Sequence, residues 1–500
     1  MTEVLAKYRS LIIIWVISLF FVALNGILIY KEVFYLPLLP FVLFFMLVAF
    51  TALDRLILMI VFFVPLSIPL SYLVQGLPFD LYLPTEPLLA GAMLLFFIKY
   101  LRGEKADIRI LRHPVTMAIY FNLAWMFMTT LTSTDILVSA KYLLARIWFV
   151  ISFYLLAAMI FRERKNMRRY VWLYIVSFSL VVAYTLIRHS AYGLNNQMMA
   201  HSMMQPFYKD HTSYGATLAM LLPVLIALLS NVKKEAVNAR FLMILLIIFY
   251  TFATVFSYTR AAWLSLAIGL GIWVLIKLKI RFMFVLISAA ALIALFLTFE
   301  TQIMLNIEKN RQQSSGKFTE HVESMSNVST DQSNLERINR WSCAIRMFEE
   351  RPVFGFGPGT YQFEYARFQR SYEKTQISTD FGNRGTAHSE YLGPLSESGL
   401  LGMLSIIFVI VSIILTGIRV YYTARDVHIR RFALGILIGF ITYCIHGFLN
   451  NFLDTDKASA LFWGFAAILV AMDIFHRESA DKHPGDRILS SAIPKPDDVD

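Results

Sequence analysis

The sequence predicts an all-α polytopic membrane protein with about fourteen transmembrane helices. Three observations support this fold class. The 500 residues are 57% hydrophobic and only 16% charged, too few charges to cover so much apolar surface in water. Apolar runs of about 18 residues or more, long enough to cross a bilayer core of about 30 Å, recur along the chain. Basic residues gather in alternate loops between these runs, as in membrane proteins that follow the positive-inside rule.

Each predicted span is one such apolar run. In chain order they lie near residues 10–30, 33–53, 56–74, 81–99, 114–133, 138–161, 170–188, 213–230, 241–257, 261–277, 282–299, 394–418, 432–452 and 458–475. Prolines interrupt the third and fourth runs. The first run is too long for a signal-peptide core and has no cleavage site after it, so we expect an uncleaved anchor.

The runs divide the chain into four regions. Residues 1–299 hold helices 1–11, residues 300–393 form a large polar loop domain, residues 394–475 hold helices 12–14, and residues 476–500 form a polar tail that is predicted to be disordered. The basic loops place both termini in the cytoplasm, and the large loop then lies outside, in the periplasm of a diderm bacterium. The net charge of +11 is therefore a topology signal rather than a sign of nucleic-acid binding.

The large loop is expected to be helical in part. Residues 312–333 are polar and predicted to be loop. Ser333 and Glu336 have the spacing of a capping box, and the helix that they open runs to about Glu350, before Arg351-Pro352. Its apolar face should cover the spans or lie in the membrane interface, and it consists of Ile338, Trp341, Ile345 and Phe348.

Two glycine-rich turns follow that helix. Residues 355–359 (GFGPG) cannot form regular structure and predict a tight turn. A second helix is expected at about Thr360–Tyr372. Residues 382–385 (GNRG) then form another turn, which delivers His388 to the start of the next span.

Arginines near the outer ends of spans are candidates for binding an anion. Arg260 lies in a short outer turn, where the positive-inside rule disfavours a cation, so it either snorkels or holds a ligand. Arg337 and Arg340 share one side of the predicted helix, where they are either solvated charges or a fork for phosphate oxygens. Arg146 lies within the sixth span and is either a site residue or a member of an internal ion pair.

His388 is the candidate general base. An imidazole with a pKa near about 6.5 can accept a proton from a sugar hydroxyl at neutral pH. Glu390 and Glu397 could orient its ring or could be solvated. Asp210 and His211 open the eighth span, where Asp210 is also a candidate helix cap. No Walker loop, dinucleotide fingerprint, zinc spacing or nucleophile elbow occurs, so we predict no cofactor and no metal site.

Several of these segments resemble the signature of the O-antigen ligase and polymerase superfamily. They are residues 351–361 (RPVFGFGPGTY), 387–392 (AHSEYL) and 397–402 (ESGLLG). Residues 259–263 (TRAAW) resemble the arginine-bearing turn of that family, and Asp210-His211 and residues 448–463 are similar too. Ser389 departs from the family pattern, which often has an asparagine there.

The resemblance implies a metal-independent, inverting glycosyltransferase of the C-type membrane fold in the bacterial inner membrane. The donor would be a glycan on undecaprenyl pyrophosphate, and the acceptor would be lipid A–core, another lipid-linked repeat or protein. By motif match, Arg260 would bind the pyrophosphate together with Arg337 or Arg340, and His388 would be the general base or the acceptor-activating residue. Candidates for a supporting role are Glu390, Tyr391, His211 and Asp210.

Three functions stay open at this point. The first is an O-antigen ligase-like enzyme, and the second is a polymerase of O-antigen or exopolysaccharide repeats. The third belongs to another class, a transporter or flippase for lipid-linked sugars, which could use the same arginines without a base.

Overall fold

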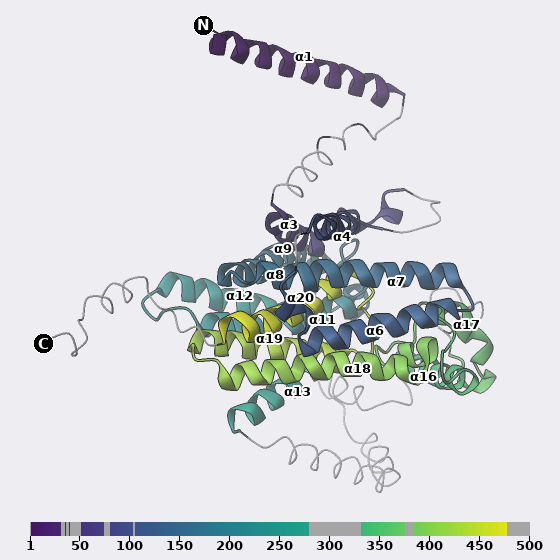
Figure 1. The fold of residues 1–500 in the computed structure, drawn as a ribbon. Helices are drawn as coiled ribbons and strands as arrows, with labels where there is room; N and C mark the ends of the chain where they lie inside the picture. The colour runs from purple at the N-terminus through teal and green to yellow at the C-terminus, as the bar shows by residue number, and fades with distance from the viewer. Residues whose placement is uncertain are drawn as a thin grey trace, which may run out of the picture. The chain divides into compact units, whose positions relative to one another are not determined.

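The structure, a computed structural model, is mostly helical and describes most of the chain. The described residues are 2–31, 36, 40, 52–74, 81–103, 106–279, 332–375, 378 and 385–477. The chain forms two compact units, Met1–Ile57 and Leu58–Asp500 (Figure 1). Four predicted features lie largely outside the described residues: the spans near 33–53 and 282–299, the loop 312–333 and the tail from 478. The turn at residues 382–385 is described only at Gly385.

The first unit contains α1 (Thr2–Tyr30), an apolar helix. From Leu11 to Tyr30 it is long enough to cross a membrane, and most of its side chains are exposed. A helix that is apolar on every side is suited to a lipid surrounding rather than to water.

Ten helices among the described residues are long and apolar enough to span a bilayer, and they confirm the polytopic α-helical fold. After α1 they are α6 (Pro114–Leu131), α7 (Ile136–Val150, continued by η4, Ile151–Leu156, and α8, Ala157–Ile160), α9 (Arg164–Ala191), α11 (His211–Ser230), α12 (Val237–Phe256), α13 (Arg260–Lys277), α18 (Leu392–Thr423), α19 (Val427–His446) and α20 (Asp456–Ala471, continued by η7, Met472–His476).

The third predicted span is not one continuous helix. Helix α3 (Leu53–Phe63) stops, and the chain continues as η2 (Val64–Leu66), β1 (Ile68–Pro69) and η3 (Leu70–Tyr72). Strand β1 pairs with β2 (Tyr82–Leu83) before α4 (Thr85–Leu101) begins, so a small antiparallel sheet interrupts the helices. Pro65 and Pro69 explain the break, because proline lacks the N–H that an α-helix needs.

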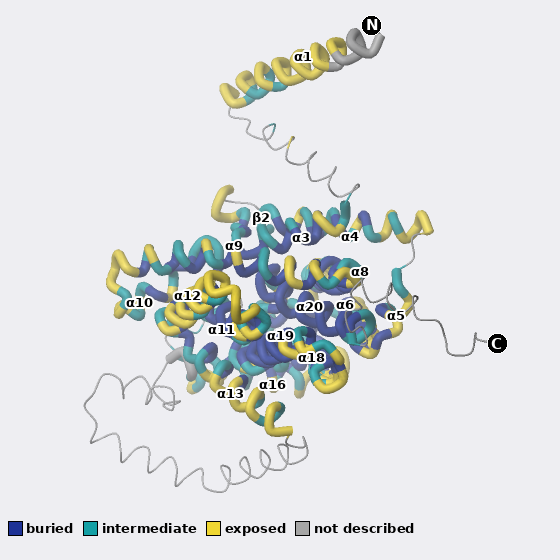
Figure 2. Tube along the Cα trace, turned by 90° about the vertical axis from the view of Figure 1, so that its left-hand side faces the viewer, coloured by how far each residue is buried: buried dark blue, intermediate teal, exposed yellow. Residues whose placement is uncertain are grey.

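Helices α19 and α20 form the buried centre of the second unit (Figure 2). Helix α11 packs along α19, and α6 packs along α18. A Cβ added at Gly435 of α19 would lie 2.3 Å from the Cβ of Ala227 in α11, so glycine permits this close approach. Asn231, after α11, donates to the carbonyl of His428 near the start of α19, with N and O 3.1 Å apart. The two helices are thus antiparallel, and the start of α11 lies beside the end of α19.

The part of the large loop that is described packs on α18. It contains α16 (Gln332–Glu350), α17 (Tyr361–Glu364), η5 (Tyr365–Phe368) and η6 (Ser371–Glu373), and α16 contacts α18 directly. Helix α16 matches the predicted helix and begins one residue before Ser333. The second predicted helix, Thr360–Tyr372, is instead a series of short helical turns. Two further short helices elsewhere are α5 (Ile108–Leu111) and α10 (Gln197–Ala200).

The predicted apolar face of α16 does not face the protein core. Ile338 is 40% exposed and Ile345 is 45% exposed. The buried side of the helix carries Cys343, Ala344 and Met347, which join the core of the loop domain. The helix thus buries its smaller residues in the core of the loop domain and leaves Ile338 and Ile345 partly exposed.

Candidate functional site

The glycine-rich turn of the signature is a backbone junction between the loop domain and α18. Phe356 N donates to Ser396 O at 3.2 Å, and Gly357 N donates to Glu397 O at 2.7 Å. Gly399 has a φ of 70°, and a Cβ there would lie 2.1 Å from the carbonyl oxygen of Val353. Only glycine tolerates both that backbone angle and that contact. Helix α18 departs from helical geometry at Gly399, so the kink is where the loop domain docks.

The other side of the same turn contacts the connection between α6 and α7. Thr134 N donates to Phe356 O at 2.8 Å, and the Ser139 hydroxyl donates to Pro358 O at 2.9 Å. A Cβ at Gly357, where φ is 114°, would lie 1.9 Å from the Ser133 hydroxyl oxygen. The turn is therefore held between α18 and the connection of α6 to α7, and it fixes the loop domain over this end of the bundle.

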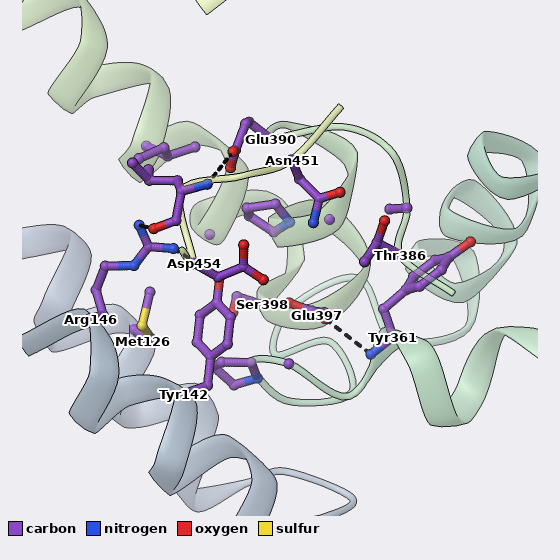
Figure 3. A pocket seen from close by; sticks show the side chains of 18 of the residues that line it. Met126, Tyr142, Arg146, Tyr361, Thr386, Glu390, Glu397, Ser398, Asn451 and Asp454 are labelled. Carbon is purple, nitrogen blue, oxygen red and sulfur yellow. Dashed lines mark hydrogen bonds between the residues drawn. The ribbon is translucent and has the colours of Figure 1, made fainter. Parts of the chain in front are cut away.

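A polar cavity of about 320 Å³ opens next to this junction. We call it the Arg146 cavity, and its polar lining includes Tyr142, Arg146, Lys209, Glu390, Glu397, Asn451 and Asp454. Figure 3 shows Tyr142 and Arg146, from α7, facing the loop that carries Asn451 and Asp454. Cations, carboxyl groups and an amide thus meet in one space, a set of groups that can bind the hydroxyls of a sugar.

Arg146 is engaged in internal contacts. It is 6% exposed, and its two terminal nitrogens donate to Leu453 O at 3.2 Å and to the Tyr142 hydroxyl at 2.9 Å. Both acceptors are neutral groups, so these contacts are hydrogen bonds rather than the internal ion pair that the sequence left open. The guanidinium holds the loop after α19 against α7 and forms one wall of the cavity.

Glu390 also holds that loop, and it does not orient His388. One of its oxygens accepts from the Tyr443 hydroxyl at 2.6 Å, from Phe452 N at 2.7 Å and from Leu453 N at 2.8 Å. Burial raises the pKa of Glu390, while the hydrogen bond from Tyr443 acts against that rise. The expectation that Glu390 is either solvated or bound to the histidine ring is therefore wrong.

Glu397 and Tyr391 have structural contacts as well. A carboxylate oxygen of Glu397 accepts from Tyr361 N at 3.0 Å, which ties the signature turn to α18, so this residue does not orient the histidine either. The Tyr391 hydroxyl donates to Cys444 O at 2.9 Å, and its ring lies 4.4 Å from that of Phe448. These contacts join the start of α18 to the end of α19.

His388 borders a second cavity of about 280 Å³, which we call the His388 cavity. Its other polar lining residues include Asp210, Ser213, Asn450 and Lys457. Lys209, Thr386, Asn451 and Asp454 line both cavities, so the two spaces adjoin. A substrate with several sugar units could occupy both at once.

The environment of His388 keeps its ring neutral. Burial lowers its pKa to about 4, and the charges of Arg337 and Arg340 contribute to that decrease, against the opposing effects of Asp210 and Glu336. The residue has a φ of 48°, in the left-handed region that non-glycine residues rarely adopt. A neutral imidazole can accept a proton, and the unusual backbone angle fixes the position of its ring.

Asp210 and His211 connect this cavity to the turn before α13. Asp210 caps α11, because its Oδ1 accepts from Ser213 N at 2.8 Å and from the Thr212 hydroxyl at 2.7 Å. The Thr259 hydroxyl donates to His211 O at 2.7 Å. The cap expected at Asp210 is present. The bond from Thr259 to His211 places Arg260, the first residue of α13, at the same end of the bundle as His388.

Arg260 and Arg337 lie beside the His388 cavity rather than in its lining. Burial lowers the pKa of His201, and the positive charge of Arg260 lowers it further, whereas the negative charge of Asp210 raises it. The His201 ring stacks on that of His211, with centroids 4.0 Å apart. Arg337 is in turn within electrostatic range of His211 and of His388. Arg260 thus acts on His201, whereas Arg337 acts on both His211 and His388.

Arg340 belongs to the interior of the loop domain. Its Nε donates to Glu336 Oε1 at 2.6 Å, and its guanidinium lies 4.1 Å from the centroid of the Tyr365 ring. Burial would raise the pKa of Glu336, but hydrogen bonds from Ser378, Arg340 and Thr375 bring it below its usual value. The charge of Arg340 is already balanced by that carboxylate.

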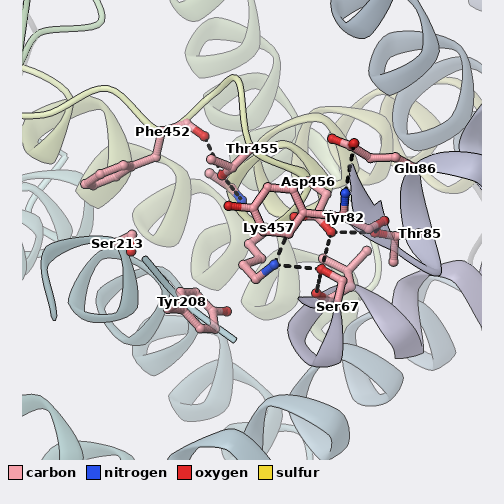
Figure 4. Close-up of polar contacts among 12 residues, drawn as sticks. Ser67, Tyr82, Thr85, Glu86, Tyr208, Ser213, Phe452, Thr455, Asp456 and Lys457 are labelled. Atoms are coloured by element: carbon pink, nitrogen blue, oxygen red, sulfur yellow. Dashed lines mark hydrogen bonds and ion pairs between the residues drawn. The ribbon is translucent and has the colours of Figure 1, made fainter. Parts of the chain in front are cut away.

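A buried ion pair at the start of α20 is a feature that the sequence did not reveal (Figure 4). Lys457 Nζ lies 3.1 Å from Asp456 Oδ1 and 2.6 Å from the Ser67 hydroxyl. The other Asp456 oxygen accepts from Ser67 and Thr85, each at 2.6 Å. Asp456 is fully buried. The sequence does contain one signal for this pair, because two adjacent residues of opposite charge begin an otherwise apolar helix.

Lys209 and Asp454 are the other residues whose importance the sequence did not show. Both are exposed to the space that the two cavities share. Lys209 precedes the capping residue Asp210, and Asp454 follows the loop that Glu390 holds. Their position next to capped helix ends is the only local signal for them.

Comparison with known proteins bears on the same segment of the chain. Residues 245–407 match the family described as O-antigen ligase. No curated protein matches the chain. The matched segment runs from α12 through α13 and the loop domain into α18, so it contains Arg260, Arg337 and His388 together with the glycine-rich junction. This multi-pass membrane chain thus contains a segment similar to the O-antigen ligase family, which supports the resemblance to the O-antigen ligase and polymerase superfamily and to its glycosyltransferase-type enzymes.

Proposed function

We propose that this protein is an O-antigen ligase-like glycosyltransferase. It moves a glycan from undecaprenyl pyrophosphate to a sugar hydroxyl of lipid A–core at the periplasmic face of the inner membrane, with both chain termini in the cytoplasm. The observation that carries the proposal is the position of His388, which borders a cavity with several polar lining residues and lies within electrostatic range of Arg337. A base beside cations suits the transfer of a sugar from a diphosphate.

The donor diphosphate is assigned to Arg260 and Arg337. A guanidinium keeps its charge near lipid and binds phosphate oxygens in bidentate fashion. As the glycosidic C–O bond breaks, negative charge grows on the leaving pyrophosphate, and fixed cations stabilise it most when they are already in position. We propose that this charge stabilisation comes from the protein's own arginines, so that the reaction is metal-independent.

His388 is assigned the role of base. The acceptor hydroxyl attacks the anomeric carbon from the side opposite the pyrophosphate, its proton passes to the imidazole, and the configuration inverts. In the protein without donor, burial and the charge of Arg337 help to keep the pKa of His388 at about 4. A bound diphosphate would neutralise that repulsion and raise the pKa, so the base becomes stronger when the donor is present.

The other candidate residues are assigned to positioning. Arg146 and Glu390 hold the loop between α19 and α20 from two sides. Asp210 fixes the start of α11, next to His211, and Tyr391 joins α18 to α19. Arg340 stabilises the loop domain through Glu336.

A polymerase of O-antigen or exopolysaccharide repeats is the second candidate, and the two adjoining cavities favour it as much as a ligase. Both reactions use the same donor chemistry and differ only in the acceptor. Deletion followed by glycan electrophoresis separates them. Unmodified lipid A–core with accumulated long polymer indicates a ligase, whereas a product with a single repeat indicates a polymerase.

The test of the chemistry is His388→Ala in a deletion strain. We expect the variant to be made and inserted normally but to transfer no glycan. His428→Ala is the matched control, because that histidine lies near the start of α19, at the end remote from His388, and should retain transfer. Transfer by the His388 variant would contradict the proposal and favour a transporter or flippase.

Arg260→Lys tests the diphosphate site. Lysine keeps the positive charge but loses the planar fork, so we expect strong loss of transfer with normal insertion. Near-normal transfer would instead identify Arg260 as a residue that only snorkels to the membrane surface.

A further inference from the structure

A groove of about 480 Å³ runs between α11, α12, α13 and α19, away from both cavities. Its lining is mainly apolar and includes Leu222, Ile226, Ile247, Leu266, Leu270 and Ile438. None of the residues that line it also lines the Arg146 or the His388 cavity. The groove is therefore a separate feature of the described part of the bundle.

One end of the groove is basic. Lys277, in the last turn of α13, and Arg431, in the first turns of α19, both line it and are exposed. Arg431 donates to Ser230 O at 2.7 Å, and Lys277 Nζ lies 5.8 Å from the centroid of the Trp273 ring. The described lining contains no acidic side chain, so this end is complementary to an anion.

The basic end lies at the opposite membrane surface from the diphosphate site. Arg260 is the first residue of α13 and Lys277 is the last, which separates them by about 26 Å along the helix axis. Leu266, at the apolar end of the groove, lies about 16 Å from Lys277 on the same axis. That length matches one leaflet of a bilayer core of about 30 Å.

We propose that this groove binds a glycerophospholipid with an anionic headgroup. The phosphate lies between Lys277 and Arg431, and an acyl chain follows the apolar lining towards Leu266. Cations at a membrane surface attract anionic lipids, and the long side chains of lysine and arginine reach the headgroup level while their stems stay in the apolar region. The site is independent of the proposed glycosyl transfer, because it takes a different lipid at the other surface.

The test uses Trp273 as a reporter inside the groove. The purified full chain is placed in lipid nanodiscs that contain brominated phosphatidylglycerol or brominated phosphatidylcholine at matched mole fractions, and tryptophan quenching is measured. Subtracting the signal of Trp273→Phe isolates this residue from the other tryptophans. We expect brominated phosphatidylglycerol to quench Trp273 at lower mole fractions than brominated phosphatidylcholine does.

Paired variants separate a specific site from general attraction to a basic surface. Lys277→Gln with Arg431→Gln should weaken the preference for phosphatidylglycerol about fivefold for each cation removed. Lys234→Gln with Arg430→Gln removes the same charge from exposed residues of the same membrane side that do not line the groove, and should keep the preference. Equal quenching by the two lipids, or equal loss in both variants, would overturn the proposal. Loss of the preference on adding inorganic phosphate would also overturn it, since that result indicates a site for free anions.

Discussion

Arg340 Nε and Glu336 Oε1 lie 2.6 Å apart, and this ion pair separates the two arginines of α16 into two roles. Arg340 is 4% exposed and lies against Tyr365 in the interior of the loop domain. Arg337, three residues earlier, acts electrostatically on His388. Sequence spacing alone could not distinguish the two, whereas the structure gives Arg340 a buried carboxylate partner within its own helix.

Arg337→Gln should therefore reduce catalysis without harming the fold. We expect kcat/KM for the lipid-linked donor to fall about 100-fold or more, the effect of removing one preorganised charge from a transition state. The thermal midpoint of unfolding should stay close to that of the unmodified protein. Both are measured on purified protein, and a stable variant with unchanged kcat/KM would exclude Arg337 from the donor site.

Arg340→Gln should have the opposite outcome. Glu336 would be left buried without its cation, and removal of one partner of such a pair costs about 3–5 kcal/mol of stability. Glu336→Gln in the same chain should recover part of that loss, which a double-mutant cycle measures. If instead the single variant is as stable as the parent but inactive, Arg340 contacts the substrate.

The pH dependence of kcat/KM should report His388 in the donor-free protein. Its pKa is lowered to about 4, so the imidazole is almost entirely neutral at pH 7 and can accept a proton. This neutral form is lost as the pH falls through about 4. Arg337→Gln removes repulsion and should raise this pKa, moving the acid limb of the profile to higher pH. An acid limb at the same pH in both proteins would show that another group titrates.

Glu390 substitutions should separate a positioning role from a chemical one. Glu390→Gln keeps an oxygen that can accept from Phe452 N and Leu453 N, so we expect substantial activity and stability. Glu390→Ala leaves both N–H groups unpaired, at a cost of about 1–3 kcal/mol each. Activity assays and thermal unfolding of both variants check this, and complete inactivity of a well-folded Glu390→Gln protein would identify a catalytic carboxylate.

Gly399→Ala should disrupt the docking of the loop domain. The added Cβ would meet Val353 O at 2.1 Å, and the residue would keep an unfavourable positive φ, so we expect a loss of about 2 kcal/mol or more. Gly91→Ala is the control, because nothing lies within 4 Å of a Cβ there and α4 should gain stability. Equal thermal stability of the two variants would contradict the junction described here.

The spans could be predicted well from the sequence because an apolar run reports its lipid surroundings without reference to any partner. The run at residues 56–74 failed for a local reason that the sequence also contained. The mean hydropathy of the run stays high despite Pro65 and Pro69. An α-helix, however, cannot continue through these prolines. A prediction that gave each proline priority over the average would have ended α3 at Phe63.

The site was predictable only in part. His388 and the cap at Asp210 follow from local context, a flexible turn and a helix start. The contacts of Arg146 with Leu453, and of Glu390 with the same loop, join residues remote in sequence. No local pattern encodes such pairings, so the sequence could not predict the contacts of these two residues.

The ion pair of Asp456 and Lys457 with Ser67 joins residues 389 positions apart. During synthesis, Ser67 and Thr85 enter the membrane long before the charged partners that satisfy them have been made. The wall of the His388 cavity that contains Lys457 cannot exist until α20 arrives. A nascent chain therefore completes the His388 cavity only once α20 has been inserted.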